Sequence, residues 1–180
     1  MRARLIKTTV IFLFALSLTA CGFHLRQQPP LPAAFHTLYV QSDQPYGQLT
    51  LQLKQILQSI GINVVDTPKE APITLKIFDE RYTTSILSES ASSSTKQYTL
   101  YLTLQYDVQN SKGQVLFGPK TIKEQRNYTV NENQVTSTNT QEDSLKEEMQ
   151  RDAVFSILMQ LGSPQASSAI SAKPKAKKSK

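Results

Sequence analysis

The residue with the clearest chemistry is Cys21, the only cysteine in the 180-residue chain. It ends the tetrapeptide Leu-Thr-Ala-Cys at 18–21, which resembles a lipobox. Such a motif implies cleavage before the cysteine, a diacylglyceryl group on its sulfur and an acyl chain on its new amino group. One acyl chain anchors a protein weakly, whereas several hold it stably on a bilayer. We therefore expect Cys21 to carry an N-acyl and an S-diacylglycerol lipid, and we expect no other cofactor.

The residues before the cysteine predict a lipoprotein signal peptide over 1–20. Basic residues open this leader, an apolar run follows over 10–18, and two small residues precede the cysteine. The alternatives are a plain secretory signal with a chance cysteine, or an N-terminal transmembrane helix. The apolar run is shorter than the roughly 20 residues that a membrane-spanning helix needs. The leader therefore favours export followed by lipid attachment.

The formal net charge of +6 is unevenly distributed along the chain. The leader contributes three basic residues, and five lysines crowd the end of the tail, which leaves the middle of the chain slightly acidic. No aromatic residue lies among the tail lysines to stack on bases, so the basic excess does not predict nucleic-acid binding. Acylation of Cys21 would leave no thiol for a disulfide or for a metal site.

The remaining sequence predicts one domain between two irregular segments. Residues 21–36 are interrupted by prolines and predict an extended, lipid-anchored linker. Residues 37–163 predict the folded domain. Residues 164–180 consist mostly of Ser, Ala, Pro and Lys and predict a disordered, lysine-rich tail that could touch an anionic surface.

Apolar periodicity locates the elements of the domain. Period-two alternation predicts strands, and steps of three and four predict helices. A polar, serine-rich stretch over 88–95 predicts a mobile surface loop, and Asn139 followed by Glu142 predicts the N-cap of the last helix. The expected strands are 38–41, 73–81, 98–108 and 115–130, and the expected helices are 46–60 and 139–161.

This order of elements predicts an α+β fold with two helices packed on one face of a mixed four-stranded sheet that contains a long antiparallel hairpin. The strands 38–41 and 73–81 are joined through a helix and should be parallel neighbours. A sheet covered on one side leaves its other face to water or to a polar protein wall. The residues expected on that face are Thr99, Tyr101, Thr103, Gln105, Lys123, Gln125 and Asn127.

The sequence does not predict an enzyme or a metal site. His24 and His36 have no acidic residue at a spacing suited to general acid-base catalysis, and no hydrolase, metalloprotease or phosphate-loop motif occurs. Asp79 and Glu80 are adjacent in an expected strand, so their side chains should point to opposite faces. We interpret both as solvated charges at a strand end.

The pentapeptide after the cysteine, Gly-Phe-His-Leu-Arg at 22–26, resembles the start of mature proteins of the LptE (RlpB) family of LPS-assembly lipoproteins. The acidic stretch Glu-Asp-Ser-Leu-Lys-Glu-Glu-Met at 142–149 resembles the late helix of that family. This resemblance implies the predicted fold and a lipid-anchored place on the periplasmic side of the outer membrane. It also implies a 1:1 complex with the β-barrel protein LptD, as plug and assembly partner, that helps lipopolysaccharide reach the cell surface.

The resemblance further implies contact with lipopolysaccharide, whose anionic phosphates call for basic side chains. The family's basic residues before the last helix are not matched, since residues 135–140 carry no charge. An accessory lipoprotein of an envelope ABC-type lipid transporter is the alternative function, and an envelope hydrolase is a third. The candidate lipopolysaccharide-binding residues lie on the predicted hairpin and are Lys96, Lys112, Lys120, Lys123 and Arg126.

Overall fold

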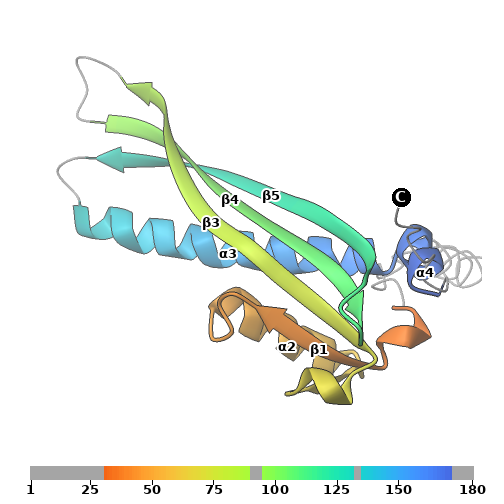
Figure 1. Ribbon diagram of the computed structural model, residues 1–180. Coiled ribbons are helices and arrows are strands. Elements are labelled where there is room, and N and C mark those ends of the chain that lie inside the picture. Colours follow the sequence, from red (N-terminus) through yellow and green to blue (C-terminus); the bar gives the residue numbers. More distant parts are fainter. Residues whose placement is uncertain (1–30, 90–94, 132–134, 172–180) are drawn as a thin grey trace, which may run out of the picture.

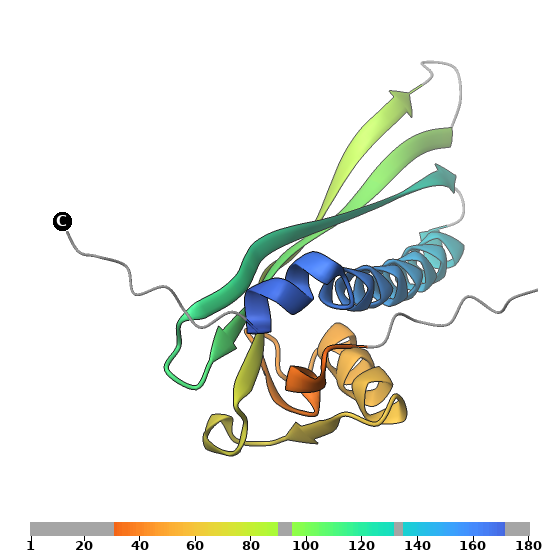
Figure 2. The same ribbon diagram turned by 90° about the vertical axis from the view of Figure 1, so that its right-hand side faces the viewer.

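The computed structural model describes residues 31–89, 95–131 and 135–171. The predicted leader, Cys21, most of the predicted linker and the lysines at the end of the tail lie outside the described residues. The fold is a two-layer α+β arrangement in which the helices cover one side of a single sheet (Figures 1 and 2).

The sheet is mixed and has five strands in the order β2-β1-β3-β4-β5. β1 runs parallel to both of its neighbours, β2 and β3, whereas β3, β4 and β5 are antiparallel. The last three strands are much longer than the first two and extend beyond them (Figure 1). The bounds are β1 Thr37–Ser42, β2 Asn63–Val65, β3 Ile73–Glu89, β4 Thr95–Asn110 and β5 Val115–Asn131.

The long helix α3 runs along the three long strands, while α2 lies with β1 near one end of them (Figures 1 and 2). At the other end, on the left of Figure 1, only the long strands and the first turns of α3 remain. We call this part the projecting end. The helices are α2 Gln48–Ser59, α3 Val135–Leu161 and α4 Pro164–Ser171, with 3-10 turns η1 Ala33–Phe35 and η2 Pro68–Glu70.

The core lies between the helices and one face of the sheet. Alternate residues of β4, from Leu100 to Val108, are buried, as the period-two pattern predicted. The apolar stripe of α3 is buried from Met149 to Leu161, as its periodicity predicted. The helical side of the sheet is therefore dry, and the opposite side is uncovered by any described helix.

The prediction of an α+β fold with a mixed sheet is confirmed, but the counts of two helices and four strands are wrong. The fifth strand, β2, spans only three residues, Asn63–Val65, and pairs with β1. Three residues are too few to show a periodic pattern. β3 and β4 also extend further than predicted, so Ser88, Glu89 and Thr95 belong to strands, while the rest of the predicted loop lies outside the described residues.

The predicted start of the last helix is wrong. α3 begins at Val135, so Asn139 lies inside the helix and is not its N-cap. The polar residues of the first turns carry no apolar stripe, which is why periodicity located the start too late. The predicted end of the helix, before Gly162 and Pro164, is confirmed.

Both boundaries of the predicted domain also shift. Phe35, placed in the linker by sequence, is fully buried in the core. Residues 164–171, predicted as disordered tail, form α4, which buries Ala166 and Ile170. The Ser163 hydroxyl accepts a 3.2 Å hydrogen bond from the Ala166 N–H, so serine followed by proline starts this helix in the usual N-cap and N1 positions.

Two truncations of the chain should separate α4 from the lysines behind it. Ending the chain after Ser171 removes only residues 172–180 and should leave the free energy of unfolding unchanged. Ending it after Ser163 also removes the buried Ile170 and Ala166. The second truncation should lower the free energy of unfolding by roughly 2–3 kcal/mol, the value of one buried branched side chain. Urea denaturation measures both, and equal stabilities would show that α4 contributes nothing to the core.

Candidate functional site

The uncovered sheet face is polar along the three long strands. Direct pairing places Thr103 opposite Lys123, Tyr101 opposite Gln125 and Thr99 opposite Asn127, so these side chains share one face. Thr99 donates a 2.9 Å hydrogen bond to Asn127 Oδ1. On β3, the register adds Arg81, Thr83 and Ser85 to the same face. We call this surface the open face; it contains all seven residues that the sequence placed there.

The five basic candidates do not form one cluster. Lys96 lies near the projecting end of β4, paired in register with Val130, whereas Lys112 lies in the turn between β4 and β5 at the opposite end of the sheet. At about 3.3 Å per residue, these two lysines are roughly 50 Å apart along the strand. Lys123 lies on the open face, whereas Lys120 and Arg126 pair in register with the buried residues Tyr106 and Leu100. A single phosphate-binding cluster of all five is therefore excluded.

Arg126 is engaged with α3. Its guanidinium donates hydrogen bonds to Asp152, to Glu148 at 3.5 Å and to the Gln125 carbonyl oxygen at 2.9 Å. Arg126 points away from the face shared by Lys123 and Gln125, because it pairs in register with the buried residue Leu100. The two carboxylates neutralise Arg126 and tie β5 to α3. We therefore withdraw Arg126 as a lipopolysaccharide contact.

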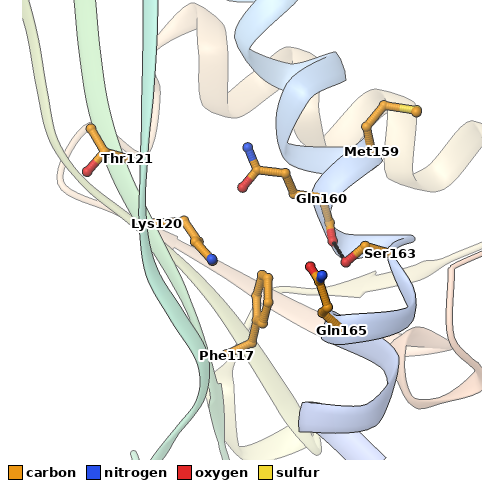
Figure 3. A pocket seen from close by; sticks show the side chains of 7 residues that line it. All are labelled: Phe117, Lys120, Thr121, Met159, Gln160, Ser163 and Gln165. Atoms are coloured by element: carbon orange, nitrogen blue, oxygen red, sulfur yellow. Dashed lines mark hydrogen bonds between the residues drawn. The ribbon is translucent and has the colours of Figure 1, made fainter.

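Lys120 faces a surface pocket of about 510 Å³ between β5, the end of α3 and the start of α4 (Figure 3). Its ammonium lies 5.3 Å from the centre of the Phe117 ring, a cation-π distance. Gln160 accepts a 2.8 Å hydrogen bond from the hydroxyl of buried Tyr106, which orients its amide. No carboxylate lines the pocket, and Lys120 makes no ion pair in the described part of the chain. The full lining is Phe117, Lys120, Thr121, Met159, Gln160, Ser163 and Gln165.

A second polar cluster joins β5 to the first half of α3. The Tyr128 hydroxyl donates a 3.1 Å hydrogen bond to Glu142, and the Lys146 ammonium lies 2.8 Å from the same carboxylate. The hydrogen bond from Lys146 is the main cause that lowers the pKa of Glu142, and burial raises the pKa of Tyr128. Glu142 therefore holds the helix against the strand, a role that replaces the capping role predicted for it.

The adjacent acidic residues Asp79 and Glu80 lie at a bulge in β3. Asp79 has φ +56° and accepts hydrogen bonds from Arg81 at 2.9 Å and Gln105 at 3.0 Å. Glu80 is half-buried, and its Oε2 atom has no hydrogen-bond partner among the described residues. The interpretation of Glu80 as a solvated charge is wrong, because the bulge turns it toward Tyr82 on the helical side. Burial raises the pKa of Glu80 and raises the pKa of Tyr82 to about 12.

Replacing Glu80 with glutamine should stabilise the protein at neutral pH. A pKa raised in the folded state means that the contribution of Glu80 to stability is fully present below its unfolded pKa. That contribution is lost as the pH rises through the folded value. The advantage of Glu80→Gln should therefore appear above about pH 4 and grow toward neutrality.

Urea denaturation of both proteins at a series of pH values measures this difference. Glu70→Gln is the control, since Glu70 is exposed in η2. Identical pH profiles for Glu80→Gln and the unsubstituted chain would show that burial of Glu80 has no energetic consequence.

No group of three His, Cys, Asp or Glu side chains in the described residues is placed to hold a metal ion. Within the same residues, no helix has the length and apolar character needed to cross a membrane. These features define a small α+β domain with an open polar sheet face and a surface pocket beside Lys120.

The chain belongs to the LptE family. The family model described as "LptE: Lipopolysaccharide-assembly" matches residues 35–161, which is most of the chain. An LPS-assembly lipoprotein LptE from Pectobacterium atrosepticum is 29% identical over 163 residues, covering 89% of this chain and 86% of that protein. One from Photorhabdus laumondii is 24% identical over 161 residues, covering 89% and 87%. The family is one of lipopolysaccharide-assembly lipoproteins of the cell envelope, not a family of enzymes.

Solved structures support the fold. A minor lipoprotein from Acinetobacter baumannii superposes with a TM-score of 0.62 at 21% identity, covering 74% of this chain and 93% of that one. The rare lipoprotein B from Shewanella oneidensis superposes with a TM-score of 0.61 at 20% identity, covering 72% and 96%. The family match ends at Leu161, so α4 and the Gln165 wall of the pocket lie beyond it.

Proposed function

We propose that this chain is an outer-membrane lipoprotein, anchored through acylated Cys21 on the periplasmic side, that binds the β-barrel LptD in a 1:1 complex. It serves as plug and assembly partner of the barrel and helps lipopolysaccharide reach the outer surface. Membership of the LptE family supports the assembly role. The open face is the observation that carries the barrel contact.

A transmembrane barrel has a polar interior, because lumen-facing side chains alternate with lipid-facing ones. The open face offers rows of Thr, Ser, Gln and Asn with few charges, which can exchange hydrogen bonds with such a wall. A helix layer covers the other side, so the open face is the side of the sheet left for a partner. The projecting end adds a narrow part of the domain that consists of three strands and one helix (Figure 1).

Affinity isolation of the detergent-solubilised chain tests the proposal. We expect an outer-membrane barrel in equimolar amount. Thr103→Arg places a third long cation between Arg81 and Lys123 on the open face and should weaken the complex. Gln58→Arg, at an exposed position of α2, is the matched control and should not. An inner-membrane permease in place of the barrel would favour the transporter-accessory function instead.

For lipopolysaccharide itself, we propose contact through Lys120 and Lys123, with Lys96 and Lys112 more distant. Lys120 stands in a pocket that no acidic side chain lines, and Lys123 is exposed on the open face. Lys120→Ala combined with Lys123→Ala should weaken binding of purified lipopolysaccharide but not of its dephosphorylated form. Lys54→Ala on α2 serves as control. Equal binding by all variants would exclude these two contacts.

A further inference from the structure

One edge of β3 is unpaired over most of its length. Pairing with β1 ends where Ser42 meets Ile77, whereas β3 continues to Glu89. Beyond Ile77, β4 is the only strand in the described part of the chain that pairs with β3. The edge of β3 opposite β4 therefore presents main-chain N–H and C=O groups that no described strand pairs. In Figure 1 this edge runs from the level of α2 to the projecting end.

The free edge contains a regular stretch between two bulges. Register with β4 shifts between Phe78 and Arg81 and again between Ile86 and Ser88, and residues 81–86 pair without interruption. Regular pairing on one side fixes the extended backbone of this stretch. On its other side, alternate residues direct both main-chain groups outward. The stretch is thus preformed as a template for one further strand.

The two long edges of the sheet differ in how they are protected. β5 carries Pro119, Lys120, Lys123 and Arg126, and proline and charged side chains are the common means of blocking an edge. The β3 stretch reads Arg-Tyr-Thr-Thr-Ser-Ile over 81–86, with one charge, no proline and mostly residues that favour strands. Of these two long edges in the described part of the chain, that of β3 is the one suited to pairing with another chain.

Two exposed apolar side chains lie at the end of this edge. Ile86 and Leu87 are 57% and 56% exposed, although both are large and aliphatic. An added strand that ended beside them would remove part of this apolar surface from water. Main-chain pairing and side-chain burial thus point to the same occupant, an extended segment with few charges.

We propose that residues 81–86 of β3 bind an extended segment of the partner barrel polypeptide as an added strand, with apolar side chains of that segment covering Ile86 and Leu87. This inference rests on the proposed function, because it takes the occupant from the same partner. Main-chain hydrogen bonds would supply affinity, and the exposed Ile86–Leu87 pair would fix the register.

Proline substitution at neighbouring positions tests the main-chain pairing. Of Thr83 and Thr84, one directs its N–H to β4 and the other to the free edge. Proline at the position whose N–H points to β4 should unfold the sheet. Proline at the position whose N–H points to the free edge removes only an outward donor. The folded variant, identified by its thermal melting, should form the barrel complex about tenfold less well. The folded member of the pair Thr129→Pro and Val130→Pro, on the β5 edge, is the control and should bind normally.

A photo-activatable cross-linker at Ile86 tests the side-chain contact even if both proline variants of β3 unfold. It should join the full chain to a single short segment of the barrel. The same cross-linker at Val115, which is 48% exposed at the far end of β5, should not. Cross-linking of Ile86 to a second copy of this chain, or to nothing, would overturn the inference. If all edge variants bind the barrel equally well, the added-strand inference is wrong but the proposed function stands. If the unsubstituted chain binds no barrel, the proposed function itself is contradicted.

Discussion

Substitution of Cys21 by alanine, in a chain produced in large excess over the partner barrel, should release that excess from the outer membrane while leaving the domain folded. Cys21 is the only residue of the chain whose side chain can carry the thioether-linked lipid. Several acyl chains, each contributing about 0.8 kcal/mol per buried methylene, account for stable anchoring. We expect the domain to stay folded, since buried residues between Phe35 and Ile170 form a continuous core within the described part of the chain. Fractionation of membranes and mass spectrometry of the N-terminal peptide measure the two effects.

The control for this experiment separates lipid from leader. A chain with Cys21→Ala behind an ordinary secretory leader should be recovered soluble in the periplasm with an unchanged melting temperature. The unsubstituted chain should yield an N-terminal peptide whose mass includes the lipid. An unmodified Cys21, or a Cys21→Ala chain that stays in the outer membrane as before, would show that anchoring does not depend on this residue.

The parts of the fold that could be predicted are those with a long, regular apolar pattern. Alternate burial from Leu100 to Val108 on β4 and the stripe from Met149 to Leu161 on α3 follow directly from period two and period 3.6. Both patterns extend over several repeats, so a single exception does not obscure them. The open face followed from the same alternation, because residues between the buried ones must point the other way.

The parts that could not be predicted depend on contacts between distant segments. Phe35 is buried only because the chain before β1 folds back onto the core. Ser163 and Pro164 start α4, but a proline at this place is equally typical of the end of the preceding helix. The same residues therefore fitted both a new helix and an irregular tail. The sequence gives no sign that Arg126 has acidic partners, whereas in the structure Asp152 and Glu148 on α3 neutralise it.

The candidate site shows the same division. The sequence placed Lys123 on the uncovered face of the sheet, which the register confirms. It could not show that Lys120 would share a pocket with Gln160 and Gln165, because α4 was not expected. The free edge of β3 was equally hidden, since it depends on β1 ending at Ser42 while β3 continues. The length of a strand can be estimated from the sequence, but the point at which its neighbour in the sheet ends cannot.

Replacing Gly118 with alanine should cause the largest loss of stability of any substitution to alanine at a glycine of the β4–β5 hairpin. Gly118 precedes Pro119 on the edge strand β5, and the register of β5 with β4 shifts beside them. Gly118 has φ +96°, a conformation that costs other residues about 1–3 kcal/mol. An added Cβ would also lie 2.9 Å from the Tyr106 carbonyl oxygen and 3.2 Å from Asp107 Cα.

Both of those neighbouring atoms belong to the main chain of β4 and cannot rotate away, so the strands must separate. Overpacking of this kind costs about 1–3 kcal/mol, and the combined loss should be roughly 3 kcal/mol or more. Gly113→Ala is the matched control, since Gly113 has φ +75° but an added Cβ there would meet nothing within 4 Å. It should lose only the conformational part, about 1–2 kcal/mol. Urea denaturation compares the two, and equal losses would mean that the approach of β5 to Tyr106 is loose enough to accept a methyl group.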